Sequence, residues 1–173
     1  ENMIVIKAAG DIRDSSPYGY ITAPGKAWNI ITVGGINDGG DSDWSNDRMS
    51  SISSWRNPAN TNGNRDGTSD REKPEVVAVA DSVKTIVETQ PPNVVILRES
   101  SGTSHSAPQV AGLAALLIDR HSSLVLWPEA VKAIVMTSAI HNIEWPSSIR
   151  QDSTDDKDGA GAIDASLADI VAQ

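Results

Sequence analysis

The feature that most constrains this chain is a run of small residues, Gly102-Thr103-Ser104-His105-Ser106-Ala107-Pro108, that leads into an apolar stretch. From Ser104 to Arg120, apolar residues recur three and four positions apart, as on one face of a helix. This face comprises Val110, Leu113, Ala114 and Leu117, and it is widened by Ala111, Ala115 and Ile118. A helix that is apolar all round is typical of a protein interior. The sequence therefore predicts a buried helix with Ser104 in its first turn.

The rest of the chain alternates between short apolar runs and polar loops. Five runs have the composition of strands: Met3–Ala8, Asn29–Ile36, Val76–Ala80, Val83–Val87 and Val94–Leu97. Two further helices are expected, one opened by Pro128 and one over Ala165–Val171. Between Asn37 and Asp70 the chain is rich in Gly, Asn, Asp and Ser, which predicts long loops. Strands covered by helices indicate an α/β domain.

The composition argues against several classes of function. The 173 residues carry a formal net charge of −9, which argues against a nucleic-acid-binding surface because phosphate contacts need clustered positive charge. No apolar run approaches the ~20 residues needed to span a bilayer, so no membrane span is expected. Cysteine is absent, which excludes a disulfide framework and a thiol nucleophile.

Ser104 has two chemical interpretations. A serine at the start of a buried helix can expose its hydroxyl as a nucleophile, and the helix N-terminus then stabilises developing negative charge. Gly102 would let a substrate backbone approach, and Gly112 would let the helix pack closely. A serine at this position is also the commonest kind of helix N-cap. Local chemistry alone leaves both interpretations open.

The wider arrangement resembles the C-terminal part of a subtilase, a subtilisin-like serine peptidase. GTSHSAPQVAG (Gly102–Gly112) matches the nucleophile motif of that family, and IVIKAAGD (Ile4–Asp11) resembles its oxyanion strand. Further segments match in the family's order, namely APGKAWNIITVGGI from Ala23, KPEVVAVA from Lys73, WPEAVKAIVMTSA from Trp127 and DGAGAIDASLA from Asp158. The resemblance implies a three-layer α/β fold with a mostly parallel sheet, of which residues 1–173 form the C-terminal portion.

The resemblance also assigns roles to residues. It implies that Ser104 is the nucleophile, that its own N–H helps to bind the oxyanion, and that the reaction is hydrolysis of a polypeptide through an acyl-enzyme. The residues that it places at the substrate are Ala8, Ala9, Gly10, Thr22, Gly25, Gly102 and Thr103. Family habit places such enzymes outside the cell or at its surface.

Asp11 departs from the family's pattern, in which an Asn at this position donates a hydrogen bond to the oxyanion. An ionised carboxylate can only accept, and losing one such donor costs roughly 10²–10³ in rate. A protonated Asp11 could still donate, and one kexin-like convertase resembles this chain in having Asp there. Alternatively, Asp11 caps a turn or binds a cation.

The triad is incomplete in this sequence. The family's Asp and His lie well before the oxyanion residue, and the three histidines here, His105, His121 and His141, do not replace them. His105 follows Ser104 directly, and adjacent helix residues point about 100° apart; His121 and His141 are expected to be structural. We therefore expect a fragment, or one chain of a cleaved enzyme, that retains its missing N-terminal half or self-associates.

Two questions stay open at this level. The altered Val79-Ala80, where the family has Pro-Gly, and Asp11 also fit an inactive pseudoprotease that binds peptides or acts as a scaffold. No cofactor is required, but calcium is possible at two oxygen-rich loops. These are Asp38, Asp41, Asp43 and Asp47, and Asn62, Asn64, Asp66 and Asp70, with solvated loops as the alternative.

Overall fold

The fold was derived from a computed structural model, which describes residues 3–11, 21, 23–55, 73–89, 94–140 and 157–173. Its central sheet is built around β2 (Ile30–Asn37), a run of β-branched residues and glycines. β1 (Val5–Ala8) and β4 (Val76–Val79) are parallel to β2 and lie on its two sides, since Val33 pairs with both Ala8 and Val76. The short β3 (Arg48–Met49) runs antiparallel to the end of β2.

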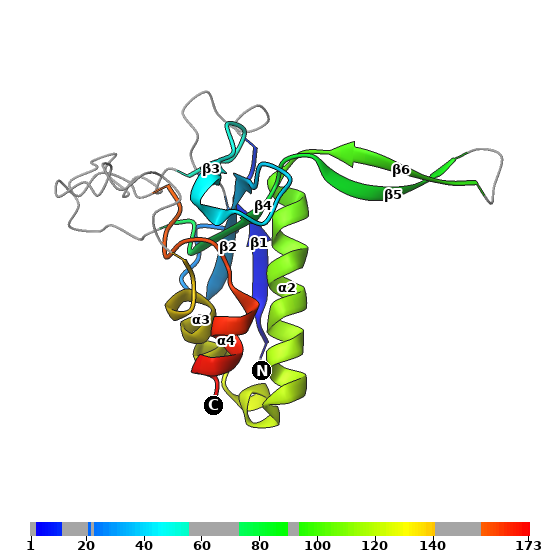
Figure 1. Ribbon diagram of the computed structural model, residues 1–173. Coiled ribbons are helices and arrows are strands. Elements are labelled where there is room, and N and C mark those ends of the chain that lie inside the picture. Colours follow the sequence, from blue (N-terminus) through cyan, green and yellow to red (C-terminus); the bar gives the residue numbers. More distant parts are fainter. Residues whose placement is uncertain (1–2, 12–20, 22, 56–72, 90–93, 141–156) are drawn as a thin grey trace, which may run out of the picture.

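Helix α2 (Thr103–Arg120) crosses this sheet and contacts β1, β2 and β4 (Figure 1). After it come the 3₁₀ turn η2 (Ser122–Leu126), α3 (Pro128–Thr137) and α4 (Ala165–Val171). Pro128 begins α3, where a proline removes no helical hydrogen bond, and the Asp164 side chain caps α4 by accepting from the Leu167 N–H. The strands and helices form the α/β arrangement expected from the sequence.

The core lies between the sheet and these helices. Side chains from the strands and from the helices form one apolar cluster. Its members include Ile31, Val33, Val76, Val110, Leu113, Leu117, Val131 and Val135. All of these side chains are less than 7% exposed, so the helical spacing read from the sequence identified the buried face of α2 correctly. No helix in the described part of the chain is both long and apolar enough to cross a bilayer.

The prediction that α2 is buried all round is wrong. Ala111, Ala115 and Leu116 are exposed, with Leu116 67% accessible, because the described sheet and helices cover only part of the helix. Gly112 is exposed as well, and a Cβ added to it would meet no atom within 4 Å. The expected close packing at Gly112 is therefore absent among the described residues.

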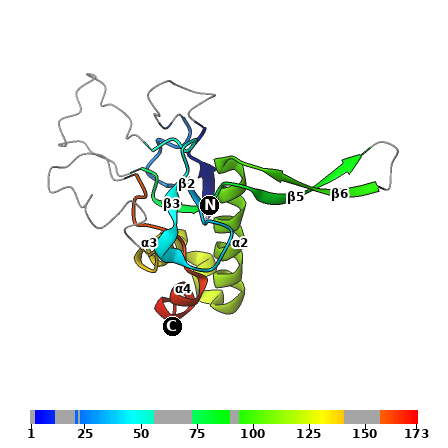
Figure 2. The same cartoon turned by 45° about the horizontal axis from the view of Figure 1, so that its top comes forward.

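The strands before α2 are longer than the sequence suggested. β5 (Val83–Thr89) and β6 (Val94–Ser100) pair in antiparallel register from Val83↔Ser100 to Thr89↔Val94. They form an arm that projects away from the sheet and helices in both views (Figures 1 and 2). The polar residues beyond Val87 and Leu97 continue the ladder because backbone pairing does not require apolar side chains.

Two features of the loops also differ from expectation. The segment after β2 contains the 3₁₀ turn η1 (Trp44–Asn46) and β3, where long loops were predicted. Asp158, an acidic residue in a polar stretch of the sequence, is only 1% exposed, because the turn through Gly159 and Gly161 is bonded to the end of β4.

Candidate active site

The first turn of α2 is fixed to the end of β4 by hydrogen bonds. The Gly102 N–H donates to the Ala80 carbonyl at 2.9 Å, and the Ser106 hydroxyl donates to the carbonyls of Ala78 and Val79 at 3.1 and 3.2 Å. Ser104 is exposed at the second residue of the helix. It therefore belongs to the N-terminal turn, whose helix dipole favours negative charge.

Thr103 joins this turn to the end of β1. Its hydroxyl accepts from the Gly10 N–H at 3.1 Å and donates to Asp11 Oδ1 at 3.0 Å. Thr103 is 1% exposed, so these bonds form in a place that water does not reach freely. The segment after β1 and the segment before Ser104, ninety residues apart in sequence, are therefore held at a fixed separation.

Asp11 acts as an acceptor in this arrangement. Its Oδ1 accepts from the Thr103 N–H at 2.9 Å as well as from the Thr103 hydroxyl. Its Oδ2 faces Gly102, where an added Cβ would come within 3.0 Å of that oxygen. Asp11 thus has the position of a cap at the start of α2, and Gly102 leaves room for its second oxygen.

The remaining candidate residues fall into two groups. Ala8, Ala9 and Gly10 follow one another at the carboxyl end of β1, with the Ala9 N–H bonded to the Val33 carbonyl at 2.8 Å. Gly102 and Thr103 stand opposite them. The structure therefore brings five of the seven proposed substrate-binding residues to one edge of the sheet.

Gly25 is buried in a separate loop, and its carbonyl accepts from the Thr32 hydroxyl at 2.7 Å. Thr22 lies outside the described residues. The expected pocket wall around these two residues therefore stays a prediction.

A buried group of charges, which sequence reasoning missed, supports the Gly25 loop. Lys73 and Glu75 are 2% and 4% exposed and form an ion pair. The Lys73 ammonium also donates to the carbonyls of Ala27 and Ile30, at 3.0 and 3.2 Å, and to the Thr32 hydroxyl at 3.3 Å.

Lys132 of α3 completes this group. Its ammonium contacts Glu75 Oε1 at 2.6 Å and the carbonyls of Trp28 and Ile30 at 3.0 Å each. Glu75 Oε2 accepts from the Thr32 N–H at 2.7 Å, so both carboxylate oxygens have donors. In the sequence, Lys73 is simply a lysine that comes shortly before the β-branched strand Val76–Val79. A lysine in this position is not a sign of a buried ion pair.

None of the histidines that the structure describes forms a triad with Ser104. His121 terminates α2 and contacts Asp169 of α4 at 3.1 Å, which agrees with its expected structural role. His121 lies 17 positions after Ser104 in the sequence, which corresponds to about 25 Å along the helix at 1.5 Å per residue. His105 is half-buried next to Ser104, and His141 lies outside the described residues.

The acidic loop after β2 uses some of its carboxylates in turns. Asp43 accepts from the side chain and the backbone of Ser45, and these bonds lower the pKa of Asp43. Asp38 accepts from the Gly40 N–H and Asp41 from the Asp43 N–H.

Within the described residues, no three acidic or histidine side chains are grouped in a way that could hold a metal ion. The second oxygen-rich loop, with Asn62, Asn64, Asp66 and Asp70, falls outside them. Calcium therefore remains a prediction.

Comparison with known proteins agrees with the geometry. The model of the subtilase family (Peptidase_S8) matches residues 1–165. No curated protein matches the sequence.

Solved structures share the fold at low identity. The prenylagaramide maturation protease PagA is 22% identical with a TM-score of 0.61, and the match covers 99% of this chain and 51% of that one. A protease from Pseudoalteromonas arctica PAMC 21717 is 20% identical with a TM-score of 0.66, covering 99% and 43%. Fervidolysin from Fervidobacterium pennivorans is 16% identical with a TM-score of 0.67, covering 98% and 22%. This chain thus spans about half, or less, of the length of these structures.

The buried charges lead to a stability prediction. Replacing Lys73 by Met removes one of the two cations at Glu75 and the donor to the Ala27 carbonyl, and we expect a loss of about 3 kcal/mol in the free energy of unfolding. Asp169→Asn, which breaks the more exposed contact with Arg120, is the matched control and should cost less than about 1 kcal/mol. Urea denaturation followed by circular dichroism measures both. Equal losses in the two variants would contradict the importance assigned to the buried group.

Proposed function

This chain belongs to the subtilase family, whose members are serine peptidases, and we propose that it forms the nucleophile-bearing part of a serine endopeptidase. Ser104 attacks the carbonyl carbon of a peptide bond, and the amine product leaves. Water then attacks the acyl-enzyme, releases the acid product and restores the Ser104 hydroxyl. We base the choice of a polypeptide substrate and of this reaction on family membership and on the site described above.

The observation that carries this proposal is the placement of Ser104. It is exposed at the start of α2, while its neighbours Thr103 and Ser106 are buried and bonded to the sheet. A serine that serves as an N-cap stands just before the first helical residue, yet the N-cap of α2 is Gly102 and Ser104 is the second residue of the helix. The same turn supplies the backbone N–H of Ser104 for the oxyanion.

The general base and the carboxylate that orients it come, in this proposal, from residues outside these 173. Support comes from the histidines that the structure describes, of which His121 is remote and His105 is adjacent on the helix. The structural match to PagA, which covers 51% of that chain, is compatible with this division.

The alternative function is that of a pseudoprotease that binds polypeptide without cleaving it. The position of Asp11 favours it, because an acceptor replaces a donor beside the site of the oxyanion. The two functions predict opposite outcomes for the same labelling experiment.

Two surfaces that no described segment covers, on β1 and on α2, suggest that the chain binds a partner. Among the described strands, β1 pairs only with β2, so that one edge of β1 has no strand beside it. On α2, the neighbouring side chains of Ala111 and Ala115 are exposed. We propose that either the other part of the catalytic domain or a second copy covers these surfaces.

The proposed activity makes three predictions, of which the first is that a fluorophosphonate probe labels the longest natural chain that contains residues 1–173. The label should map to Ser104. Ser104→Ala should abolish labelling without changing the circular dichroism spectrum, while Ser101→Ala, three residues earlier, should leave it intact. Mass spectrometry of the digested protein locates the adduct. A folded protein that does not react would favour the pseudoprotease.

The second prediction concerns Asp11. In an Asp11→Asn variant, the side-chain oxygen can keep both bonds from Thr103, and the amide takes the place of Oδ2 and supplies a donor. We expect the rate of labelling to rise by about 10²-fold, the effect of one oxyanion donor. Asp11→Ala, which removes both the acceptor and the possible donor, should not show the increase. Equal rates in the Asn variant and the parent would indicate that Asp11 already donates or lies outside the oxyanion site.

The third prediction is that residues 1–173, expressed alone, do not sediment as a monomer. Adding the preceding part of the natural chain should restore a single species, because it covers the free edge of β1 and the exposed side of α2. Analytical ultracentrifugation distinguishes these states. A monomeric and cooperatively folded 173-residue chain would argue against the partner.

A further inference from the structure

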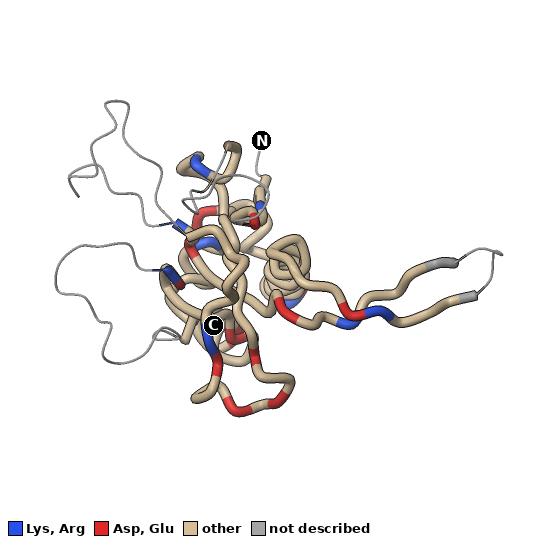
Figure 3. Tube along the Cα trace, turned by 90° about the horizontal axis from the view of Figure 1, so that it is seen from above, with Lys and Arg blue, Asp and Glu red and all other residues tan. Residues whose placement is uncertain are grey.

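The arm formed by β5 and β6 pairs with no other strand that the structure describes. It stands apart from the central sheet and the helices in three directions of view (Figures 1, 2 and 3). A ribbon of only two strands is at best marginally stable in water, because it covers little apolar surface. An additional strand beside the arm would therefore stabilise it.

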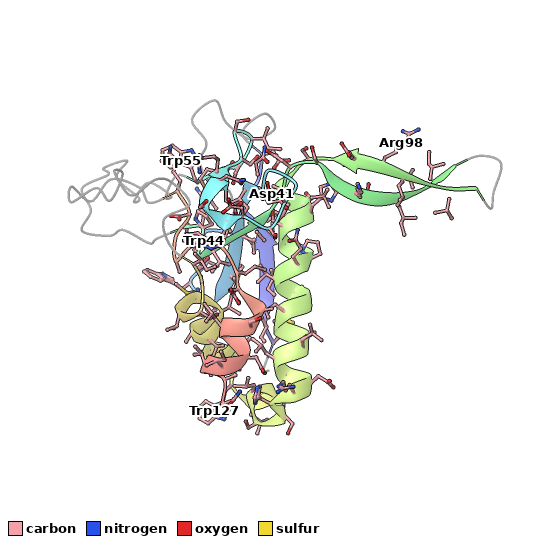
Figure 4. The ribbon with its side chains drawn as sticks, viewed as in Figure 1. Asp41, Trp44, Trp55, Arg98 and Trp127 are labelled. Carbon is pink, nitrogen blue, oxygen red and sulfur yellow. The ribbon has the colours of Figure 1, made fainter. Side chains whose placement is uncertain are left out.

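One face of the arm carries exposed apolar side chains. Ile86 and Leu97 stand opposite each other in the ladder and are 73% and 66% exposed. Val95, two positions before Leu97 and hence on the same face, is also 66% exposed. Arg98 belongs to the other face and points away from α2 (Figure 4). Adjoining apolar side chains with this much exposure are typical of a contact surface.

The free edge of β5 is the stronger template for a new strand. Five of the seven residues of β5 are β-branched, and the strand has neither proline nor glycine. β6 has three β-branched residues among its seven and ends in Arg98-Glu99-Ser100. β-branched residues favour the extended conformation, and an edge strand offers unpaired backbone N–H and C=O groups to another chain. We therefore expect strand addition at the β5 side of the arm.

The charges of β5 are complementary to those of a second β5. A two-fold axis that crosses the edge of β5 beside Ile86 sets the two strands antiparallel. Ile86 then stands opposite Ile86 of the copy, and the exposed Lys84 stands opposite position 88, which is Glu in the sequence. Residues directly opposite each other lie on the same face, so both ends of the contact combine unlike charges. Moving the copy to either adjacent register on this face would set Ile86 against Lys84 or Glu88 instead.

This complementarity offsets a general repulsion between copies. The chain has a formal net charge of −9, so two copies repel each other. The part of the arm next to the sheet differs from the rest of the molecule, since it carries charges of both signs (Figure 3). Lys84, Arg98 and Glu99 are exposed there and are neighbours in the ladder. A contact made through the arm therefore meets less repulsion than a contact made elsewhere on the acidic surface.

We propose that two copies of this protein associate through β5, so that their arms form one four-stranded antiparallel sheet. The Ile86 side chains meet at the two-fold axis, and Lys84 of each copy pairs with Glu88 of the other. The axis joins the same surface on both copies, so association stops at a dimer. β6 ends two positions before Gly102, so the contact also steadies the segment that leads to Ser104.

The test is sedimentation equilibrium of the longest natural chain carrying Ser104→Ala, which prevents self-cleavage. We expect a reversible monomer–dimer equilibrium with a Kd on the order of 10 μM, as for a small interface. Ile86→Lys sets two like charges opposite each other at the axis and should raise the Kd at least tenfold. Leu97→Lys is the matched control, because Leu97 lies on the same face with similar exposure but on β6, and its Kd should stay within about twofold of the parent.

A second pair of variants tests the register. Glu88→Lys sets a lysine opposite Lys84 of the copy at both ends of the contact, and we expect the Kd to rise about tenfold at low salt. Adding Lys84→Glu to this variant restores the unlike pairs and should recover most of the loss. Since salt screens both attraction and repulsion, the Kd values of the parent and of Glu88→Lys should converge at about 0.5 M salt.

Two results would overturn the proposal. One is a parent chain that stays monomeric up to about 500 μM, where even a weak dimer is populated. The other is equal weakening by Ile86→Lys and Leu97→Lys, which would mean that the faces of the arms stack and that the edge of β5 is not used. Neither result would bear on fluorophosphonate labelling of Ser104, so the failure of this contact and the failure of the proposed activity are distinguishable.

Discussion

The arrangement of this molecule depends on the junction between the carboxyl ends of β1 and β4 and the N-terminus of α2. Thr103 bonds to both Gly10 and Asp11, and Gly102 bonds to Ala80. Because these bonds are largely buried, the first turn of α2 cannot shift without leaving donors and acceptors unsatisfied. Ser104 is thus presented at a defined place beside the backbone that follows β1, which is the geometry a nucleophile needs.

A second constraint is electrostatic. The chain carries a formal net charge of −9, yet two ammonium groups and one carboxylate meet inside it, at Lys73, Lys132 and Glu75. The carbonyls around them belong to Ala27, Trp28 and Ile30, so the two cations hold the chain between the Gly25 loop and the start of β2.

The two sides of α2 have different consequences. Ala111 and Ala115 face one direction, where the family match and the free edge of β1 support a partner that completes the domain. Gln109, Gly112 and Leu116 line a pocket of about 540 Å³ beside the acidic loop after β2. The helical spacing identified the side of α2 that faces the core, but Ala111, Ala115 and Leu116 are apolar as well, so the sequence gave no indication that the described segments would leave them exposed.

The sequence by itself determined the features that depend on neighbouring residues. It placed α4 at Ala165–Val171, began α3 at Pro128 and began α2 within one residue of Thr103, because caps, prolines and helical spacing act locally. The expectation that Ser104 and Asp11 share one site came only through resemblance to a family, and the structure bonds Asp11 to Thr103, the residue before Ser104. Only the tertiary structure decided that Lys73 and Asp158 are buried and that Leu116 is exposed. Each of these depends on which distant segment covers a side chain, and no local pattern encodes that.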